Sequence, residues 1–215
     1  MESGPDPMTP CSITLVRVSK EFNRRPIFAD IDLSLAAPGS IALTGRNGAG
    51  KSTLAKVIAG LLSPTQGVVQ YAIEGKTVDS ETMRSHIGFV SPYLNLYDEF
   101  SALENLVFLS RIRGDRGVKR TDFEGMLDGV GLAERMNDRV GTFSSGMKQR
   151  LKYAFALLHK PTILILDEPT SNLDTEGSTF VHEIVVSQRK SGILVVATND
   201  AHEASWCERR IRLGQ

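Results

Sequence analysis

The chain opens with stretches in which apolar and polar residues alternate, and later contains stretches in which apolar residues run without interruption. The alternation in SITLVRV, from Ser12, and FADIDLSL, from Phe28, predicts half-buried antiparallel strands separated by the turn-like EFNRRP. SIALTG, from Ser40, predicts a strand that ends in a glycine-rich loop. The runs ILIL and ILVV, beginning at Ile163 and Ile193, are typical of parallel strands covered on both faces.

Helical spacing begins after SIALTG and returns in the middle of the chain. KSTLAKVIAGLL predicts a helix that stops before the turn SPTQG. Three helical patterns follow between about residues 100 and 160, namely SALENLVFLSRIRG, TDFEGMLDGVGL and SSGMKQRLKYAFALLHK. The strand TILILD, the helix TEGSTFVHEIVVSQRK, the strand GILVVAT, a short helix and the strand RIRL complete the pattern. We therefore expect an α/β fold with a parallel sheet core, a small antiparallel β subdomain and an inserted α-helical subdomain at about residues 93–160.

Composition and charge narrow the class of protein. The 215 residues, 41% of them hydrophobic, suffice for a single domain at residues 11–215, preceded by a proline-containing disordered tail at residues 1–10. Because 25 basic residues balance 25 acidic ones, we expect no nucleic-acid partner. Cys11 and Cys207 lack metal-ligand spacing, the N-terminus lacks the features of a signal peptide, and no apolar run approaches the roughly 20 residues that cross a bilayer. We expect a reduced, cytoplasmic protein.

The loop after SIALTG carries the first candidate chemistry. GRNGAGKST fits G-x-x-x-x-G-K-[ST] between a predicted strand and a predicted helix. The glycines let backbone N–H groups close around phosphate oxygens, Lys51 reaches the β- and γ-phosphates, and Ser52 is placed to ligate Mg²⁺. A glycine turn that only caps a helix is the structural alternative. The pattern predicts a P-loop NTPase fold with nucleotide contacts at Gly45, Arg46, Asn47, Gly48, Ala49, Gly50, Lys51, Ser52 and Thr53.

A pair of acids ends the buried strand ILILDEP, from Ile163. Carboxylates at that position are costly unless they face a cation or phosphate site. We expect Asp167 to ligate Mg²⁺ together with Ser52, and Glu168 to be the general base that polarises an attacking water. A simple turn at the end of the strand is the alternative.

The segment FSSGMKQR, from Phe143, contains a motif that P-loop kinases and GTPases lack. It resembles the signature sequence of ATP-binding cassette (ABC) ATPases, usually LSGGQ, which lies shortly before the acidic strand, as here. Ser144 and Gly146 match the phosphate-contacting positions of that signature, whereas Ser145 and Met147 depart from it. Without the resemblance, the segment reads as an N-cap or an anion site at a helix N-terminus.

Two further segments extend the resemblance over nearly the whole chain after residue 12. SNLD, from Ser171, is similar to the D-loop of this family. Phe22 is similar to the aromatic residue that stacks on adenine, although an ordinary hairpin aromatic is the alternative.

The resemblance implies an ABC nucleotide-binding domain that binds and hydrolyses ATP with Mg²⁺. In this family two such domains enclose two ATP molecules, with the signature of one domain facing the P-loop of the other, so a homodimer or a pair of ATPase subunits is expected. Integral membrane permease subunits are the other expected partners, which places the chain peripherally on the inner face of the cell membrane. The short chain resembles the single-domain ATPase of the heme exporter in cytochrome c maturation, so heme or another exported compound is the expected cargo.

The first departure from the family lies in HIGFVSPYLNLYDEF, from His86. ABC ATPases usually have a glutamine there that senses Mg²⁺ and water, but this chain has Ser91 and Pro92, and no glutamine lies between Gln70 and Gln149. Ser91 or Asn95 are the candidates to orient water instead, and a plain turn serine is the alternative.

The second departure lies in VVATNDAHEA, from Val195. The family usually has Thr-His-Asp here, and its histidine contacts the γ-phosphate, whereas this chain has Asn199. Asn199 can donate a hydrogen bond to phosphate but cannot carry the charge of an imidazolium, so slow hydrolysis is expected. The spacing of Asp200 and Glu203 indicates a helix cap, with Asp200 as N-cap and His202 at the second helical position; a catalytic His202 is the alternative.

The sequence leaves two alternatives for the function of the chain and two interpretations of one apolar segment. The missing glutamine and histidine favour an ATP-driven assembly scaffold with vestigial hydrolysis, whereas Glu168 favours a hydrolase. A soluble ABC ATPase of DNA repair or translation would carry long insertions or duplicated cassettes, which are absent here. The apolar residues of SPYLNLYDEF either contact a membrane subunit or pack inside the helical subdomain; they are Leu94, Leu96, Tyr97 and Phe100.

Overall fold

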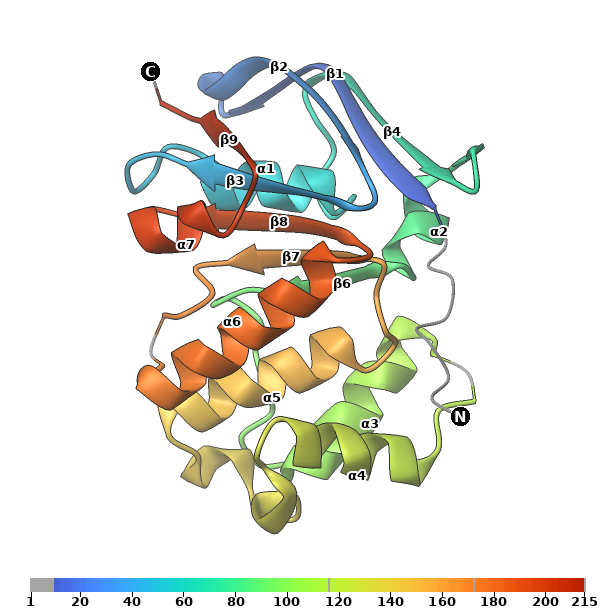
Figure 1. The fold of residues 1–215 in the computed structure, drawn as a ribbon, viewed down its shortest axis with the longest axis vertical. Coiled ribbons are helices and arrows are strands. Elements are labelled where there is room, and N and C mark those ends of the chain that lie inside the picture. Colours follow the sequence, from blue (N-terminus) through green and yellow to red (C-terminus); the bar gives the residue numbers. More distant parts are fainter. Residues whose placement is uncertain (1–9, 116, 172, 215) are drawn as a thin grey trace.

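The chain folds into two sheets and a group of helices. The structure is a computed structural model that describes residues 10–115, 117–171 and 173–214. In Figure 1 the antiparallel sheet lies above the parallel sheet, and helices α3, α4 and α5 lie below it. Within the described residues, no helix combines the length and the apolar character needed to cross a membrane.

The antiparallel sheet is built by strands β1 (Cys11–Phe22), β2 (Arg25–Ala36), β4 (Gln66–Ile73) and β5 (Lys76–Val78), in the order β2-β1-β4-β5. Phe22 pairs with Arg25, so the turn between β1 and β2 contains only Asn23 and Arg24. Both turn residues have positive φ angles, 50° and 62°, as the favoured two-residue hairpin turn requires. The sequence predicted EFNRRP as a turn, but most of this segment belongs to the two strands. The strands are therefore longer, and the turn shorter, than predicted.

The central sheet is parallel and five-stranded, in the order β6-β7-β8-β3-β9. Its strands are β3 (Gly39–Thr44), β6 (Ile87–Val90), β7 (Ile163–Asp167), β8 (Ile193–Thr198) and β9 (Arg209–Arg212). Every residue of β7 and β8 is buried, which confirms the prediction from the runs ILIL and ILVV. Ile165 and Val195 pack toward β1, β2 and α1, whereas Leu164 and Leu194 pack toward α5 and α6.

Helices cover both faces of the central sheet. Helix α1 (Lys51–Ile58) contacts β3, β7 and β8. Helices α5 (Ser145–Leu157) and α6 (Thr175–Arg189) cover the opposite face (Figure 1). The short helices α2 (Ser80–Arg84) and α7 (Ala201–Ser205) complete this layer structure.

A separate hydrophobic core holds the helical subdomain together. Helices α3 (Ala102–Arg113), α4 (Arg120–Gly129) and α5 contribute to it, with 3₁₀ turns at Ala133–Arg135 and Val140–Thr142. Leu106, Leu127 and Leu151 are fully buried there, one from each helix. The three helices predicted from the sequence are thus all present. Residues 1–9 of the expected tail lie outside the described residues, and the carbonyl of Pro10 accepts a 2.7 Å hydrogen bond from the amide of Glu74.

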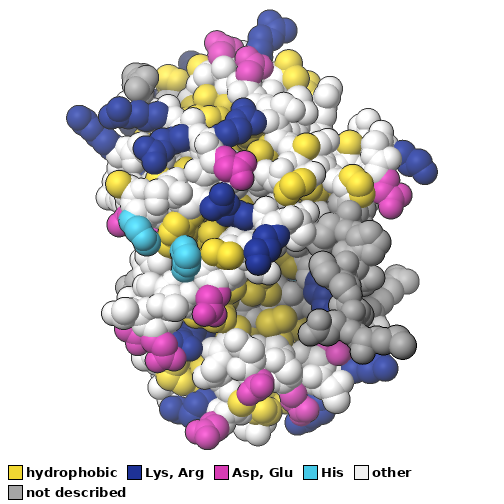
Figure 2. Space-filling view, viewed as in Figure 1, with side chains coloured by type: hydrophobic (Ala, Val, Ile, Leu, Met, Phe, Trp, Pro, Cys, Tyr) yellow, Lys and Arg dark blue, Asp and Glu magenta, His cyan; other side chains and the backbone are white. Residues whose placement is uncertain are grey.

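The surface carries charges of both signs. Figure 2 shows acidic and basic side chains interspersed on this face, with Lys and Arg gathered around the region of β2 and β9. In β9, Arg209, Arg210 and Arg212 are exposed, which suits the edge strand of a sheet because charged residues discourage pairing with another chain.

Candidate functional site

The parallel pairing of β3, β7 and β8 brings three functional segments to one edge of the sheet. Thr44 pairs with Thr198, and Asp167 pairs with Ala197, so the three strands end side by side. A pocket of about 380 Å³ lies at this edge. Such a position, at the carboxyl ends of parallel strands, is where open α/β sheets bind ligands. The pocket is lined by Asn47, Gly48, Lys51, Ser52, Pro92, Tyr93, Asp167, Glu168 and Asn199.

The loop between β3 and α1 has the conformation of a phosphate-binding loop. Gly48 and Gly50 have positive φ angles of 80° and 96°, and Gly50 occupies the N-cap position of α1. A Cβ at Gly50 would lie 2.6 Å from Cγ2 of Ile27, so a side chain there would be both strained and crowded. The loop therefore presents its backbone and the N-terminus of α1 to the pocket.

Lys51 folds back over this loop. Its side chain is buried, and its Nζ donates to the carbonyls of Gly45 at 3.1 Å and Arg46 at 3.3 Å. A buried ammonium beside the N-terminus of α1 makes the pocket favourable for an anion.

Asp167 and Ser52 meet at the base of the pocket. Oγ of Ser52 donates to Oδ1 of Asp167 at 2.9 Å, which joins the start of α1 to the end of β7. Burial raises the pKa of Asp167, while the Ser52 hydrogen bond and the charges of Lys56 and Lys51 oppose that rise. The carboxylate is thus held in a costly position in which its charge is only partly compensated.

These residues fit a divalent cation bound together with phosphate. Oδ2 of Asp167 is buried and has no hydrogen-bond partner among the residues that the structure describes. No group of three or more His, Cys, Asp or Glu side chains in the described part of the chain could hold a metal ion. A cation here would therefore take Ser52 and Asp167 as ligands and complete its shell with phosphate and water oxygens, as Mg²⁺ does.

Glu168 lies directly after Asp167 in an unusual backbone conformation. Its φ is 53°, a left-handed value that is uncommon for a residue other than glycine and that is found where the surrounding structure fixes it. Its amide donates to the carbonyl of Ala197 at 2.9 Å. Burial raises the pKa of Glu168, Lys51 lowers it, and the nearby carboxylates of Glu203, Asp167 and Asp200 raise it further. A carboxylate with a raised pKa is a stronger base.

Asn199 reaches the same pocket from the end of β8. Its Nδ2 donates to Oδ1 of Asn47 at 2.9 Å, so the side chain is held against the P-loop. The three segments that the sequence singled out therefore converge: the P-loop, the acidic pair and the asparagine.

Comparison with known proteins identifies the family. The family model described as ABC transporter matches residues 28–171. This chain belongs to the ABC transporter family. The fold expected from the sequence, that of a P-loop NTPase, is confirmed by a dimeric ATP-binding cassette in a post-hydrolysis state bound to ADP and Pi. That structure has a TM-score of 0.81 and 26% identity, and the match covers 94% of both chains. The chain is thus an ATP-binding, ATP-hydrolysing ABC subunit.

Curated relatives point to several transport systems. The chain is 36% identical over 200 residues to the lipoprotein-releasing system ATP-binding protein LolD of Xanthomonas axonopodis pv. citri, covering 89% of this chain and 82% of LolD. It is 35% identical to the linearmycin resistance ATP-binding protein LnrL of Bacillus subtilis and 34% identical to the Nod factor export ATP-binding protein I of Rhizobium leguminosarum bv. viciae. The matches cover 85% and 97% of this chain, respectively. This chain spans 59% of the length of LnrL and 68% of that of the Nod factor protein.

The signature segment of this ABC subunit lies away from its own phosphate pocket. Ser144 is the N-cap of α5, and its Oγ accepts a 3.2 Å hydrogen bond from the amide of Met147. Ser144 is exposed and Gly146 is half-buried, and neither of them lines the pocket. The cap and the exposed helix N-terminus are both present, so the two interpretations of FSSGMKQR are compatible.

Two other expected motifs are placed as follows. Phe22 ends β1 with its ring 44% exposed, and Nζ of Lys20 lies 5.0 Å from the ring centroid. Phe22 does not line the phosphate pocket. In the D-loop-like SNLD, Asp174 caps α6 by accepting a 2.8 Å hydrogen bond from the amide of Gly177, while Asn172 lies outside the described residues.

The loop at the expected glutamine position reaches the pocket through Pro92 and Tyr93, for which the sequence predicted no role. Ser91 is buried, and its Oγ accepts from the amide of Tyr93 at 3.2 Å, which is the geometry of a turn residue. Neither Ser91 nor Asn95 lines the phosphate pocket, whereas Pro92 and Tyr93 do. Nζ of Lys152, on α5, donates to the carbonyl of Pro92 at 2.8 Å and holds this loop in place. The sequence signal that could have indicated this contact is Tyr93, the aromatic residue directly after Pro92.

The predicted helix cap after Asn199 is confirmed. Asp200 is the N-cap of α7 and accepts hydrogen bonds from the amides of His202, at 2.6 Å, and Glu203, at 3.1 Å. His202 is exposed, and its ring packs against Trp206 with the centroids 5.7 Å apart. His202 does not line the phosphate pocket. The sequence pattern did not reveal the position of the Glu203 carboxylate, which does not bond back to the cap.

Proposed function

We propose that this chain is the ATPase subunit of an ABC exporter, which pairs around ATP with a second ATPase subunit and drives transport through separate membrane subunits. The observation that carries this proposal is the single pocket that unites Lys51, Asp167, Glu168 and Asn199. In this proposal the phosphates of ATP bind to the P-loop, and the other residues of the pocket act on the γ-phosphate and the attacking water. The chain acts at the inner face of the membrane.

In the proposed reaction Lys51 and the N-terminus of α1 bind the phosphates, and Glu168 accepts a proton from the attacking water. Lys51 would exchange its present contacts with Gly45 and Arg46 for phosphate oxygens, so nucleotide binding replaces one set of acceptors by another. Mg²⁺, when bound at Ser52 and Asp167, supplies positive charge that stabilises the transferring phosphoryl group. The amide of Asn199 donates a hydrogen bond at the same end of the pocket.

Pairing of two subunits is supported by the position of the signature segment. Ser144 and Gly146 stand at an exposed helix N-terminus outside the pocket of their own chain, where they are free to contact the ATP of a second subunit. ATP then favours the closed pair because only that state supplies this additional contact. The similarity to a dimeric ATP-binding cassette supports the same arrangement.

Hydrolysis separates this proposal from an assembly scaffold. Glu168→Gln keeps the shape of the side chain but removes the base, so phosphate release should fall by at least about 100-fold while ATP binding persists. The exposed Glu183→Gln on α6 is the matched control and should behave as the wild type. Equal phosphate release by Glu168→Gln and the wild type would refute the hydrolase mechanism.

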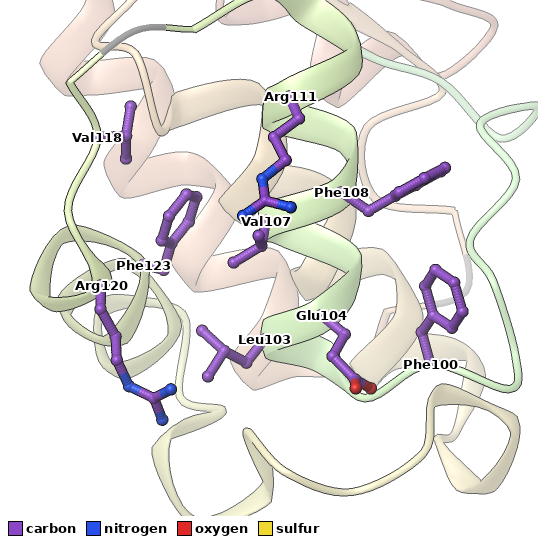
Figure 3. A pocket seen from close by; sticks show the side chains of 9 residues that line it. All are labelled: Phe100, Leu103, Glu104, Val107, Phe108, Arg111, Val118, Arg120 and Phe123. Atoms are coloured by element: carbon purple, nitrogen blue, oxygen red, sulfur yellow. The ribbon is translucent and has the colours of Figure 1, made fainter.

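The surface that we propose for the membrane subunits is the aromatic cluster of Tyr97, Phe100 and Phe108. The ring centroids lie 5.0 to 5.6 Å apart, and Tyr97 and Phe108 are 44% and 37% exposed. Figure 3 shows Phe100 and Phe108 on one side of α3 and Phe123 on the other, bordering a pocket of about 490 Å³. Leu96, in contrast, packs in the core of the helical subdomain, so the two interpretations of this segment apply to different residues.

Membrane association tests this surface. Phe108→Glu should release the chain from native membranes with basal ATP hydrolysis retained, because a charge replaces an apolar contact far from the phosphates. Val186→Glu, at a similarly exposed apolar residue on α6, is the matched control and should remain bound. Retention of both variants would contradict the assignment of this surface.

The cargo is proposed from the relatives alone. Their names specify lipoprotein release, linearmycin resistance and Nod factor export, which supports an exported compound as the cargo here. Heme remains a hypothesis from the sequence. Binding of candidate compounds to the complex of this chain with its membrane subunits, measured by stimulation of ATP hydrolysis, tests each one.

A further inference from the structure

Glu203 is a buried carboxylate that the reaction described above does not use. It lies at the third position of α7, and its side chain is only 5% exposed. A buried carboxylate requires several hydrogen-bond donors to offset its lost hydration. The donors are found on two other segments of the chain, each of which borders the phosphate pocket.

The first segment is the turn that follows Glu168. Oε1 of Glu203 accepts a 3.1 Å hydrogen bond from the amide of Thr170 and a second hydrogen bond from its hydroxyl. Thr170 lies two residues after Glu168, whose left-handed backbone persists only where neighbouring contacts hold it. The hydroxyl of Tyr153, fully buried, donates to the carbonyl of Pro169 at 3.0 Å, so both residues after Glu168 are anchored.

The second segment is the end of β8. Oε2 of Glu203 accepts a hydrogen bond from the hydroxyl of Thr198, a fully buried residue that directly precedes Asn199. Oγ1 of Thr198 in turn accepts a 2.9 Å hydrogen bond from the amide of Asp200, the residue on the other side of Asn199. The backbone around Asn199 is therefore set by the same carboxylate that anchors the Glu168 turn.

We propose that Glu203 is a positioning residue that holds Glu168 and Asn199 in a fixed arrangement around the γ-phosphate position. The proposal rests on the proposed roles of Glu168 and Asn199 and extends them to a residue that touches no substrate. Each oxygen of the carboxylate serves one of the two segments, so one side chain couples their positions. No contact of Glu203 with the P-loop is needed, and nucleotide binding is accordingly independent of it.

The first measurement is the steady-state kinetics of Glu203→Gln. The amide can accept on one oxygen only and presents N–H groups to donors, so it cannot serve both threonines. We expect kcat to fall by about 10-fold or more, with the KM for ATP within about threefold of the wild type. Glu183→Gln is again the control on the surface. A rise in KM with unchanged kcat would overturn the proposal.

The second measurement asks whether Glu203 acts through Glu168. In single-turnover reactions, Glu203→Gln should cost a smaller fold-loss in the Glu168→Gln background than in the wild type, because only Asn199 is then left to be positioned. Equal fold-losses in both backgrounds would show that Glu203 does not act through Glu168, which would overturn the proposal and leave the base role of Glu168 intact. If Glu168→Gln alone hydrolyses ATP as fast as the wild type, the proposed function itself fails, and the positioning role fails with it.

A second variant covers the case in which Glu203→Gln does not fold. Thr170→Val removes one hydroxyl donor but keeps the backbone amide and the shape of the side chain. It should lower kcat severalfold with KM preserved, and amide exchange at Glu168 and Thr170 should quicken because their anchor is weakened. Unchanged kcat and unchanged exchange in a folded Thr170→Val protein would contradict the proposal.

Discussion

The side chains of Asn199 and Asn47 are joined by a hydrogen bond, in which Nδ2 of Asn199 donates to Oδ1 of Asn47 at 2.9 Å. This contact connects the end of β8 to the P-loop across the mouth of the phosphate pocket. It also fixes the orientation of the Asn199 amide before any nucleotide binds. The position where ABC ATPases usually carry a histidine is thus occupied by an oriented neutral donor.

Removal of the Asn199 amide should slow hydrolysis. Asn199→Ala is expected to lower kcat by roughly 100-fold, the order of loss that follows when one stabilising donor is removed from an active site. Asn199→His introduces a group that can carry positive charge and should raise kcat above that of the wild type. Phosphate release under saturating ATP measures both effects.

His202→Ala is the matched control for the Asn199 variants. Its side chain is exposed, packs on Trp206 and does not line the pocket, so turnover should remain close to that of the wild type. A loss comparable to that of Glu168→Gln would show that His202 takes part in the reaction.

Lys152 should influence turnover through the loop that carries Tyr93. Its Nζ donates to the carbonyl of Pro92 at 2.8 Å, and burial lowers the pKa of this lysine. Lys152→Met removes the anchor, so kcat should fall by about 3- to 10-fold while ATP binding is maintained. Lys148→Met is the matched control on the same helix, because its 2.7 Å ion pair with Asp98 is solvent-exposed and contributes little. Equal kinetics of the two variants would contradict this prediction.

Asp167 illustrates a trade-off between stability and ligand binding. Burial raises its pKa, so the ionised form present at neutral pH is disfavoured in the folded state, and stability is lost as pH rises through the pKa of the folded protein. Asp167→Asn removes this charge and should raise the Tm of the nucleotide-free protein, by about 2–4 °C for each kcal/mol gained. The same variant should lose most of the additional Tm increase that Mg²⁺ gives in the presence of ATP.

Thermal unfolding with and without ATP and Mg²⁺ measures both parts of this prediction. Ser52→Ala removes the hydroxyl that bonds to Asp167 without removing the buried charge, so it should lower the Tm of the nucleotide-free protein. A lower Tm for Asp167→Asn as well would mean that the carboxylate stabilises the empty protein.

His159 should make the protein acid-sensitive. Burial, with a smaller effect from Arg113, lowers its pKa to about 4, compared with 6.5 for an unperturbed histidine. Because the pKa of His159 is depressed, its contribution to stability is fully present above about pH 6.5 and is lost as the pH falls towards 4. In this range the free energy of unfolding changes by at most about 1.4 kcal/mol per pH unit because of this group. The opposing charge of Asp115 moderates the effect.

Urea unfolding at pH 7, 6 and 5 tests this prediction. His159→Gln can still donate to the carbonyl of Ile87, which lies 3.2 Å from Nε2 of the histidine, but it cannot become charged. The free energy of unfolding of the variant should therefore fall less steeply with acid than that of the wild type. Parallel curves would contradict the assignment.

Local patterns in the sequence determined much of this protein. Three features could be predicted directly from the sequence: the glycines of the P-loop, the acidic pair after ILIL and the cap at Asp200. Each depends only on neighbouring residues and on the period of one strand or helix. The convergence of these segments also followed, because parallel strands bring their carboxyl ends to one edge of the sheet.

Other features required the tertiary structure. The pairing of Val90 with Leu166 determines where the chain leaves the sheet, and this places Pro92 and Tyr93 at the pocket in place of the Ser91 and Asn95 considered from the sequence. The spacing of Asp200 and Glu203 predicted the cap correctly, but the carboxylate of Glu203 bonds to Thr170, 33 residues earlier in the chain. Spacing determines which residues share a helical turn. The hydrogen-bond partners of a buried carboxylate depend on the elements that pack against that turn. A buried carboxylate must be hydrogen-bonded to offset its lost hydration, and only the tertiary structure determines which donors lie within reach.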